Sequence, residues 1–408
     1  MFENILDKID LRQLGERLQR ARKRQGLTQE DAARILDVAR TTITAIEKGE
    51  RRIRASELVR LAEAYGREIS DFVSQRPQIS DFQVQFRSML IRSEADDERI
   101  AASIEELQEL CTDYYELELL LQRPLVKNYP ALYTYDGRRL EQAAEGLAMR
   151  ERNRLGLSDG PLPPLRDVLE QNVGLRIFYL PLEPSGKFSE IYTFEPNLGG
   201  CIAVNSRHPA ERCRWSLAHA YAHFLADRTK PVATIEDQVQ RKPESERFAD
   251  AFARYFLMPT SGLTQRFNAI YEANGRTTPA DLVKLAHYYG VSVEAMTLRL
   301  EEMKLVPGGL WERLKARGFR VKEAQEKLGL KTESEAQAAG VAESQEMLPE
   351  RYIKLAIDAY EAAEISEGEL ARYLRTDLLT ARLIVEQRRQ QEPSDAALDQ
   401  DILELADA

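Results

Sequence analysis

Apolar residues recur at helical spacing through residues 11–73, and single glycines separate the runs. The first run begins at Leu14. Thr28 then has the character of a helix N-cap, because amide and acidic side chains fill the turn that follows it. Further helices are expected over Ala39–Lys48 and Ser56–Tyr65, and a glycine follows each of them. The pattern predicts a compact module made only of short helices.

A long amphipathic stretch at about Ser93–Leu121 predicts a helix that spaces this first module from the body of the chain. Three short apolar or alternating runs, at 174–182, 187–194 and 200–205, are typical of strands in a small sheet. Helical patterns dominate elsewhere, at Glu141–Gly156, Leu165–Asn172, Ala210–Ala226, Pro243–Phe256, Ser261–Asn268, Pro279–Tyr289, Ser292–Met303 and Leu348–Gln390. The predicted fold class is mainly α with a small β-sheet (α+β).

Residues 27–52 place a capped helix, a tight turn and a second helix in the order of a helix-turn-helix motif, whose second helix enters the DNA major groove. Four polar residues at the start of the second helix are candidates for reading base edges: Arg40, Thr41, Thr42 and Thr44. Gln29 on the preceding helix and the basic pair Arg51 and Arg52 are candidates for phosphate contacts.

The charge distribution favours DNA binding over the alternative, a helical dimerisation or docking module. The whole chain has a formal net charge of −10, yet residues 11–70 contain fourteen Lys and Arg against nine Asp and Glu. The segment resembles the phage-repressor (XRE) group at Gln29, Ala33, Ile43, Ile46, Glu47, Gly49 and Leu58. Because such domains usually read paired half-sites, a homodimer on double-stranded DNA is expected.

Two of the four histidines, His219 and His223, stand four residues apart in the segment RWSLAHAYAHFLADR. On a helix this spacing puts both rings on one face, where they can hold one zinc ion. Such a pair alone is often structural, so a third ligand decides the interpretation. Glu246 begins an ExxAD pattern on a later predicted helix and is our candidate, while Asp250 could orient a ligand histidine. Three nearby acids lack that context: Glu236, Asp237 and Glu244.

The order HxxxH, ExxAD and FAxxxLMP, preceded by IAVNSRHPAERCRWSLAH, resembles the ImmA/IrrE zinc metallopeptidases over about Arg150–Arg320. The resemblance implies a zincin-like domain that binds Zn2+ through His219, His223 and Glu246. Members of that family are known for cutting helix-turn-helix repressors or antitoxins. The implied substrate is therefore a protein, either a repressor, an antitoxin or the chain itself, and the implied role is control of stress, mobile-element or defence genes.

The sequence departs from the family pattern HExxH, because Ala220 follows the first histidine. In that pattern the glutamate takes a proton from the attacking water and passes it to the leaving amine. Alanine can do neither, so we predict a metal-loaded but catalytically inactive site. An engineered Glu→Ala exchange and a natural pseudopeptidase are both compatible with this sequence. A rival interpretation is a transcriptional regulator or antitoxin whose pseudopeptidase domain senses a ligand.

Composition indicates the cellular compartment in which the protein is expected to act. The three cysteines form no CxxC pair, which favours reduced thiols over a disulfide frame or a cysteine–zinc site. No run approaches the roughly 18 apolar residues of a membrane helix, and the N-terminus lacks the pattern of a signal peptide. We therefore expect a cytoplasmic protein with no membrane partner.

These signals divide the chain into five expected parts. They are an XRE-type helix-turn-helix domain at 1–74, a helical connector at 75–140, an ImmA/IrrE-like zinc metallopeptidase domain at 141–330, a linker at 331–347, and a C-terminal helical domain with an acidic tail at 348–408. The last part is expected to serve packing, oligomerisation or partner capture.

Overall fold

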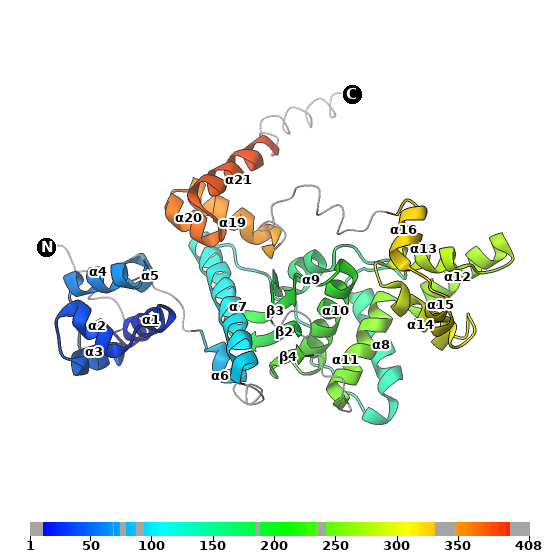
Figure 1. Cartoon of the computed structure of the whole chain (residues 1–408), viewed down its shortest axis with the longest axis horizontal. Coiled ribbons are helices and arrows are strands. Elements are labelled where there is room, and N and C mark those ends of the chain that lie inside the picture. Colours follow the sequence, from blue (N-terminus) through cyan, green and yellow to red (C-terminus); the bar gives the residue numbers. More distant parts are fainter. Residues whose placement is uncertain are drawn as a thin grey trace. The chain divides into compact units, whose positions relative to one another are not determined.

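The computed structural model comprises two units, Met1–Gln78 and Ile79–Ala408 (Figure 1). It describes residues 11–391 apart from 68, 74–78, 87–93, 184–187, 236–241 and 331–346. Most of the predicted linker and the acidic tail lie outside the described residues. The predicted fold class, mainly α with a small β-sheet, is confirmed.

The first unit is built from short helices: α1 (Leu11–Arg24), α2 (Gln29–Leu36), α3 (Arg40–Glu47), α4 (Ala55–Ala64) and α5 (Ser70–Val73). Thr28 caps α2 as predicted, because its hydroxyl accepts the Asp31 amide while the Asp31 carboxylate accepts the Thr28 amide at 2.8 Å. Leu14, Ile43 and Leu58 are buried together in the core of the unit. The two helices of the predicted motif therefore lie on a packed support that fixes α3.

The second unit contains a four-stranded mixed sheet with the order β1-β3-β2-β4. β1 (Arg176–Leu180) runs parallel to β3 (Gly199–Asn205), and β2 (Phe188–Glu195) runs antiparallel to β3 and to β4 (Val232–Ile235). The first three strands are those that the sequence predicts. β4 was not predicted from the sequence; it is a strand of four residues that is defined by its pairing with β2.

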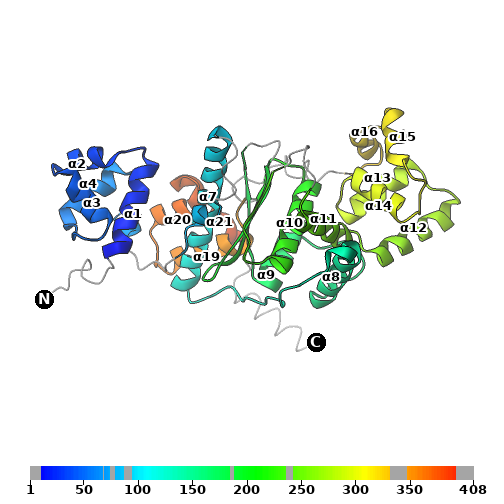
Figure 2. The same ribbon diagram turned by 90° about the horizontal axis from the view of Figure 1, so that it is seen from below.

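Helices cover both faces of this sheet (Figure 2). On one face lie α9 (Leu165–Val173) and α10 (Ala210–Ala226); α11 (Glu244–Leu257) packs on α10, and α8 (Leu140–Arg154) packs on α11. On the other face lies α7 (Glu94–Leu120), with α6 (Phe82–Phe86) and the C-terminal helices α19 (Glu350–Glu361), α20 (Glu367–Tyr373) and α21 (Leu378–Gln391) around it.

The position of α7 corrects the prediction that this helix is a spacer. Its buried residues Ile104, Leu107 and Cys111 recur at helical spacing and share a core with Ile191 of β2 and Tyr352 of α19. The apolar stripe of α7 therefore covers the second face of the sheet, and α7 belongs to the body of the second unit. The C-terminal helices complete the same layer.

Five further helices extend the core beside α8 and α11: α12 (Thr260–Asn274), α13 (Pro279–Tyr289), α14 (Val293–Glu302), α15 (Leu310–Ala316) and α16 (Val321–Lys327). The observed bounds of α13 are those predicted, since Thr278 caps it in a box with Asp281 and Gly290 ends it in a left-handed conformation. Across the residues that the structure describes, none of the helices has the length and apolar character to cross a membrane.

Candidate metal centre and nucleic-acid interface

His219 and His223 both project from α10, the helix that the sequence predicts with the same bounds. One face of α10 packs on β2 and β3, and α11 packs on another, so both rings are buried. Their centroids lie 4.9 Å apart, as expected for side chains one helical turn apart. The packing thus holds two imidazoles side by side.

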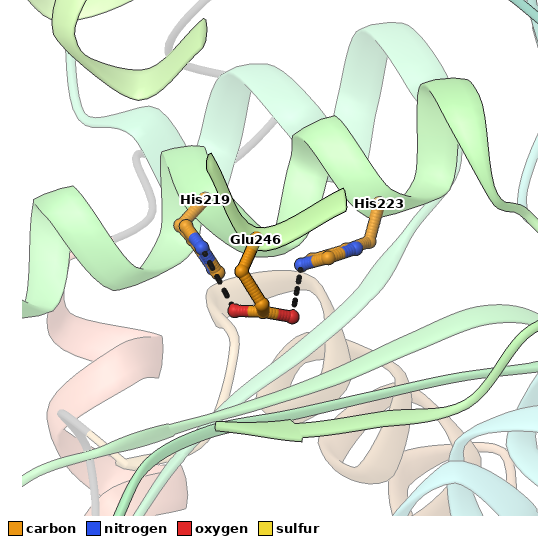
Figure 3. Close-up of side chains that lie close together, drawn as sticks. All are labelled: His219, His223 and Glu246. Carbon is orange, nitrogen blue, oxygen red and sulfur yellow. Dashed lines mark ion pairs between the residues drawn. The ribbon is translucent and has the colours of Figure 1, made fainter. Parts of the chain in front are cut away.

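Glu246, in the first turn of α11, places its carboxylate between the two rings (Figure 3). Its Oε2 lies 3.4 Å from His219 Nε2, and its Oε1 lies 3.3 Å from His223 Nε2. One ligand atom from each residue lies within 4.8 Å of the other two. A tetrahedral zinc ion with bonds of about 2.1 Å separates its ligand atoms by roughly 3.4 Å. The structure therefore brings the three predicted ligands to separations that fit one ion.

The electrostatics of this cluster favour a positive charge at its centre. Burial opposes protonation of His219, but Glu190, Glu246 and Asp250 together raise its pKa to about 9. Burial also opposes ionisation of Glu246, but His223, His219 and Lys242 hold the pKa of that carboxyl below its usual value. A divalent ion at the centre of the cluster would supply positive charge. Without an ion, a proton on His219 supplies positive charge there. The donor set and its charge fit a metal such as zinc.

Asp250 lies one turn after Glu246 but not where it would orient a histidine from behind. Its Oδ1 is 3.6 Å from His219 Nε2, the nitrogen that faces Glu246, and its Oδ2 accepts a hydrogen bond from Lys242 Nζ at 2.7 Å. Support of the ligand shell by Asp250 stays a prediction.

Glu190 lies behind His219 and was not predicted from the sequence. Its Oε1 is 2.7 Å from His219 Nδ1, and both side chains are buried. A glutamate inside a predicted strand was the available signal, since an ionised carboxylate is seldom buried without a partner.

The remaining candidates around the predicted metal site differ in their surroundings. Ala220 is fully buried in the core around α10. Glu244 is exposed at the start of α11, and it is not among the residues that converge on one point. Glu236 and Asp237 fall outside the described residues.

In the first unit, Gln29 ties α2 to α3. Its Nε2 donates to Glu47 Oε2 at 2.8 Å, and its Oε1 accepts a hydrogen bond from Thr44 Oγ1 at 3.2 Å. Both Gln29 and Thr44 are half-buried. The structure therefore gives Gln29 a positioning contact with the predicted recognition helix, and its phosphate contact stays a prediction.

The other predicted DNA contacts differ in exposure. Arg40, Thr41 and Arg52 are exposed, and Thr42 is half-buried. Arg51 forms a bidentate ion pair with Glu57, with N···O distances of 2.8 and 3.2 Å. The exposed N-terminal end of α3 thus presents Arg40 and Thr41 to solvent, as a base-reading surface requires. The structure itself does not test any of these contacts.

Matches to two families support a DNA-binding regulator with a peptidase-like domain. Residues 170–301 match the IrrE N-terminal-like domain of the M78 peptidases, and residues 18–72 match the helix-turn-helix family of XRE type. The first match contains all of α10 and α11 with all three clustered side chains, and the second contains α2 to α4. The fused architecture expected from the sequence is confirmed. No curated protein matches the chain.

Proposed function

We propose that this protein is a DNA-binding regulatory zinc metallopeptidase in which the present chain retains the metal site but has lost catalysis. The observation that carries the proposal is the convergence of His219, His223 and Glu246 from two packed helices within 4.8 Å, inside a domain of the IrrE type. The two imidazoles and the carboxylate would hold zinc. Zinc in a three-ligand protein site acts as a Lewis acid that polarises a carbonyl and activates water.

Ala220 is the reason for the proposed loss of catalysis. Peptide hydrolysis needs a group that accepts a proton from water and delivers it to the leaving amine. Alanine at this position offers no such group, and the nearby carboxylates are engaged: Glu246 with the two histidines and Asp250 with Lys242. The metal site would bind a peptide and hold it without turnover. Ala220 also supports the second candidate, a regulator whose pseudopeptidase domain senses a ligand.

The partners in this proposal follow from the two domains. The helix-turn-helix domain would bind double-stranded DNA as a homodimer, since the DNA-binding domains of repressors of this type read paired half-sites. The peptidase domain would act on a repressor, an antitoxin or a second copy of the chain, and the regulated genes would be stress, mobile-element or defence genes. Because a bacterial promoter lies in the cytoplasm, we assign the protein to that compartment.

The test compares the full-length chain with its Ala220→Glu variant. Both should bind about one zinc per chain, measured by elemental analysis after removal of loosely bound metal. The Ala220→Glu variant should cleave itself or the product of a neighbouring gene, and a chelator should stop the cleavage. Zinc binding by both forms without cleavage by either would favour the ligand-sensing pseudopeptidase. Absence of zinc from both forms would contradict the proposed metallopeptidase and would favour the second candidate.

Selection from a pool of random double-stranded DNA tests the other domain. Enrichment of a two-fold symmetric sequence by the full-length chain would support a homodimer on paired half-sites. Enrichment of no sequence would contradict the DNA-binding part of the proposal.

A further inference from the structure

Glu190 contributes a carboxylate to the back of the metal cluster. Its Oε1 lies 2.7 Å from His219 Nδ1, while Nε2 of the same ring faces Glu246. The two nitrogens of His219 thus have different partners on opposite sides of the ring. The side chains of His219 and Glu190 are only 4% and 2% exposed, so water does not compete for this contact.

Glu190 faces α10 because it alternates regularly with Ile191 and Tyr192 of β2. Tyr192 belongs to the core on the α10 face of the sheet, and Ile191 belongs to the core on the α7 face. Strict alternation would put Phe188 on the same face as Glu190, yet Phe188 lies in the α7 core. The pairing of β2 with β4 shifts register between Phe188 and Glu190, which accounts for the change of face.

Two hydroxyl groups neighbour the carboxylate. Thr234 is the partner of Glu190 across β2 and β4, and Ser216 lies on α10 one turn before His219. Together with His219, both hydroxyls keep the pKa of the buried Glu190 carboxyl below its usual value. A buried carboxylate without polar neighbours is costly, and this one has them on α10 and on β4. The arrangement links the sheet to the metal helix through one side chain.

The geometry points to Glu190 as a positioning residue that fixes the orientation and tautomer of His219. A proton held on Nδ1 by Glu190 leaves the Nε2 lone pair free to face the ion. The negative charge of Glu190 also makes the imidazole a stronger donor to a metal. This inference rests on the proposed metal site, and it assigns to β2 a residue of that site which the HxxxH and ExxAD patterns do not contain.

The experiment measures Zn2+ affinity of the full-length protein by competition with a chromophoric chelator, for the parent, Glu190→Gln and Glu190→Leu. Loss of an outer carboxylate from a histidine ligand typically costs 10–100-fold in metal affinity. We expect about a 100-fold loss for Glu190→Leu and about a tenfold loss for Glu190→Gln, whose amide oxygen can still accept the Nδ1 proton. Parental affinity in both variants would overturn the inference.

Glu195 provides a matched control on the same strand. It is equally buried, and its Oε2 accepts the backbone amides of Asn197 and Leu198 at 2.7 and 2.8 Å. Glu195→Gln should therefore keep the parental Zn2+ affinity. A loss in Glu195→Gln as large as that in Glu190→Gln would overturn the inference, because it would show a general effect of neutralising buried strand carboxylates.

Two further measurements distinguish a failure of the role of Glu190 from a failure of the proposed metal site. The Co2+ absorption spectrum should change in Glu190→Leu, because the ligand ring is no longer held in one orientation. A merely structural role would lower the unfolding temperature of the metal-free protein and leave this spectrum and the Zn2+ affinity as in the parent, which would overturn the inference. His219→Ala tests the site itself: parental affinity there would contradict the proposed function, whereas loss there with none in the Glu190 variants would contradict only the role of Glu190.

Discussion

Glu47 at the end of α3 accepts a bidentate hydrogen bond from the Arg22 guanidinium, with N···O distances of 2.6 and 3.0 Å. The pair joins α1 to the predicted recognition helix, and the two side chains are only 7% and 2% exposed. Gln29 of α2 donates to the same carboxylate. One buried acid thus fixes the mutual arrangement of α1, α2 and the predicted recognition helix α3.

Glu47→Ala should destabilise the first unit by roughly 3–5 kcal/mol, because it leaves the Arg22 charge buried without its partner. Hydrogen exchange of the α1–α4 amides in the full-length protein measures the change. The double variant Arg22→Met with Glu47→Leu should recover most of the loss, since it removes both charges. Equal protection in the parent and Glu47→Ala would contradict this role of the pair.

A pH dependence is expected from Glu170 on α9. Burial raises its pKa to about 7, against the hydrogen bond that Tyr114 of α7 donates to it at 2.8 Å. Because the folded-state pKa exceeds the unfolded value near 4.5, this contribution to stability is complete below pH 4.5 and is lost as the pH rises through 7. The loss amounts to about 3 kcal/mol at most. Glu170→Gln should flatten the stability profile of the second unit between pH 5 and 8, as measured by denaturant unfolding.

Zn2+ should stabilise the second unit through Glu246. A ligand present at about 100 times its dissociation constant adds about 2.7 kcal/mol to the free energy of unfolding. Calorimetry of the chelator-treated protein with and without added Zn2+ should show this gain in the parent and not in Glu246→Gln. Glu244→Gln is the control, because this exposed residue of the same helix lies outside the cluster, and it should keep the full gain.

DNA binding should depend on the exposed end of α3. Arg40→Ala and Thr41→Ala should each weaken binding to a selected operator by about 1–3 kcal/mol and relax its sequence preference, if these side chains read base edges. Arg317→Ala removes the same charge as Arg40→Ala from an exposed site in the second unit, and it should leave binding unchanged. Fluorescence anisotropy at fixed salt measures all three. Equal losses in Arg40→Ala and Arg317→Ala would indicate a general charge effect.

Local patterns in the sequence were sufficient to predict the helices that carry the site. The bounds of α10 and α13 follow from apolar periodicity and end signals, and the spacing of His219 and His223 predicts their shared face. These features depend on interactions within a few residues of the chain. They determine which helices form and which side chains they present.

The features that the sequence analysis missed depend on contacts between distant segments. The amphipathic pattern of α7 shows that one stripe is buried, but the sheet that buries it lies some 70 residues later in the chain. Glu190 reaches His219 because the sheet packs on α10, a helix that follows the first three strands in the chain. A glutamate inside a predicted strand indicates that a partner is needed, but the strand's own residues do not identify that partner.

The most direct test of the metal site is a crystal structure of the Zn2+-soaked full-length protein, with diffraction data on both sides of the zinc absorption edge. We predict one anomalous peak bonded to His219 Nε2, His223 Nε2 and a carboxylate oxygen of Glu246. An anomalous map with no peak among these three side chains, or with zinc bound only elsewhere on the chain, would contradict it.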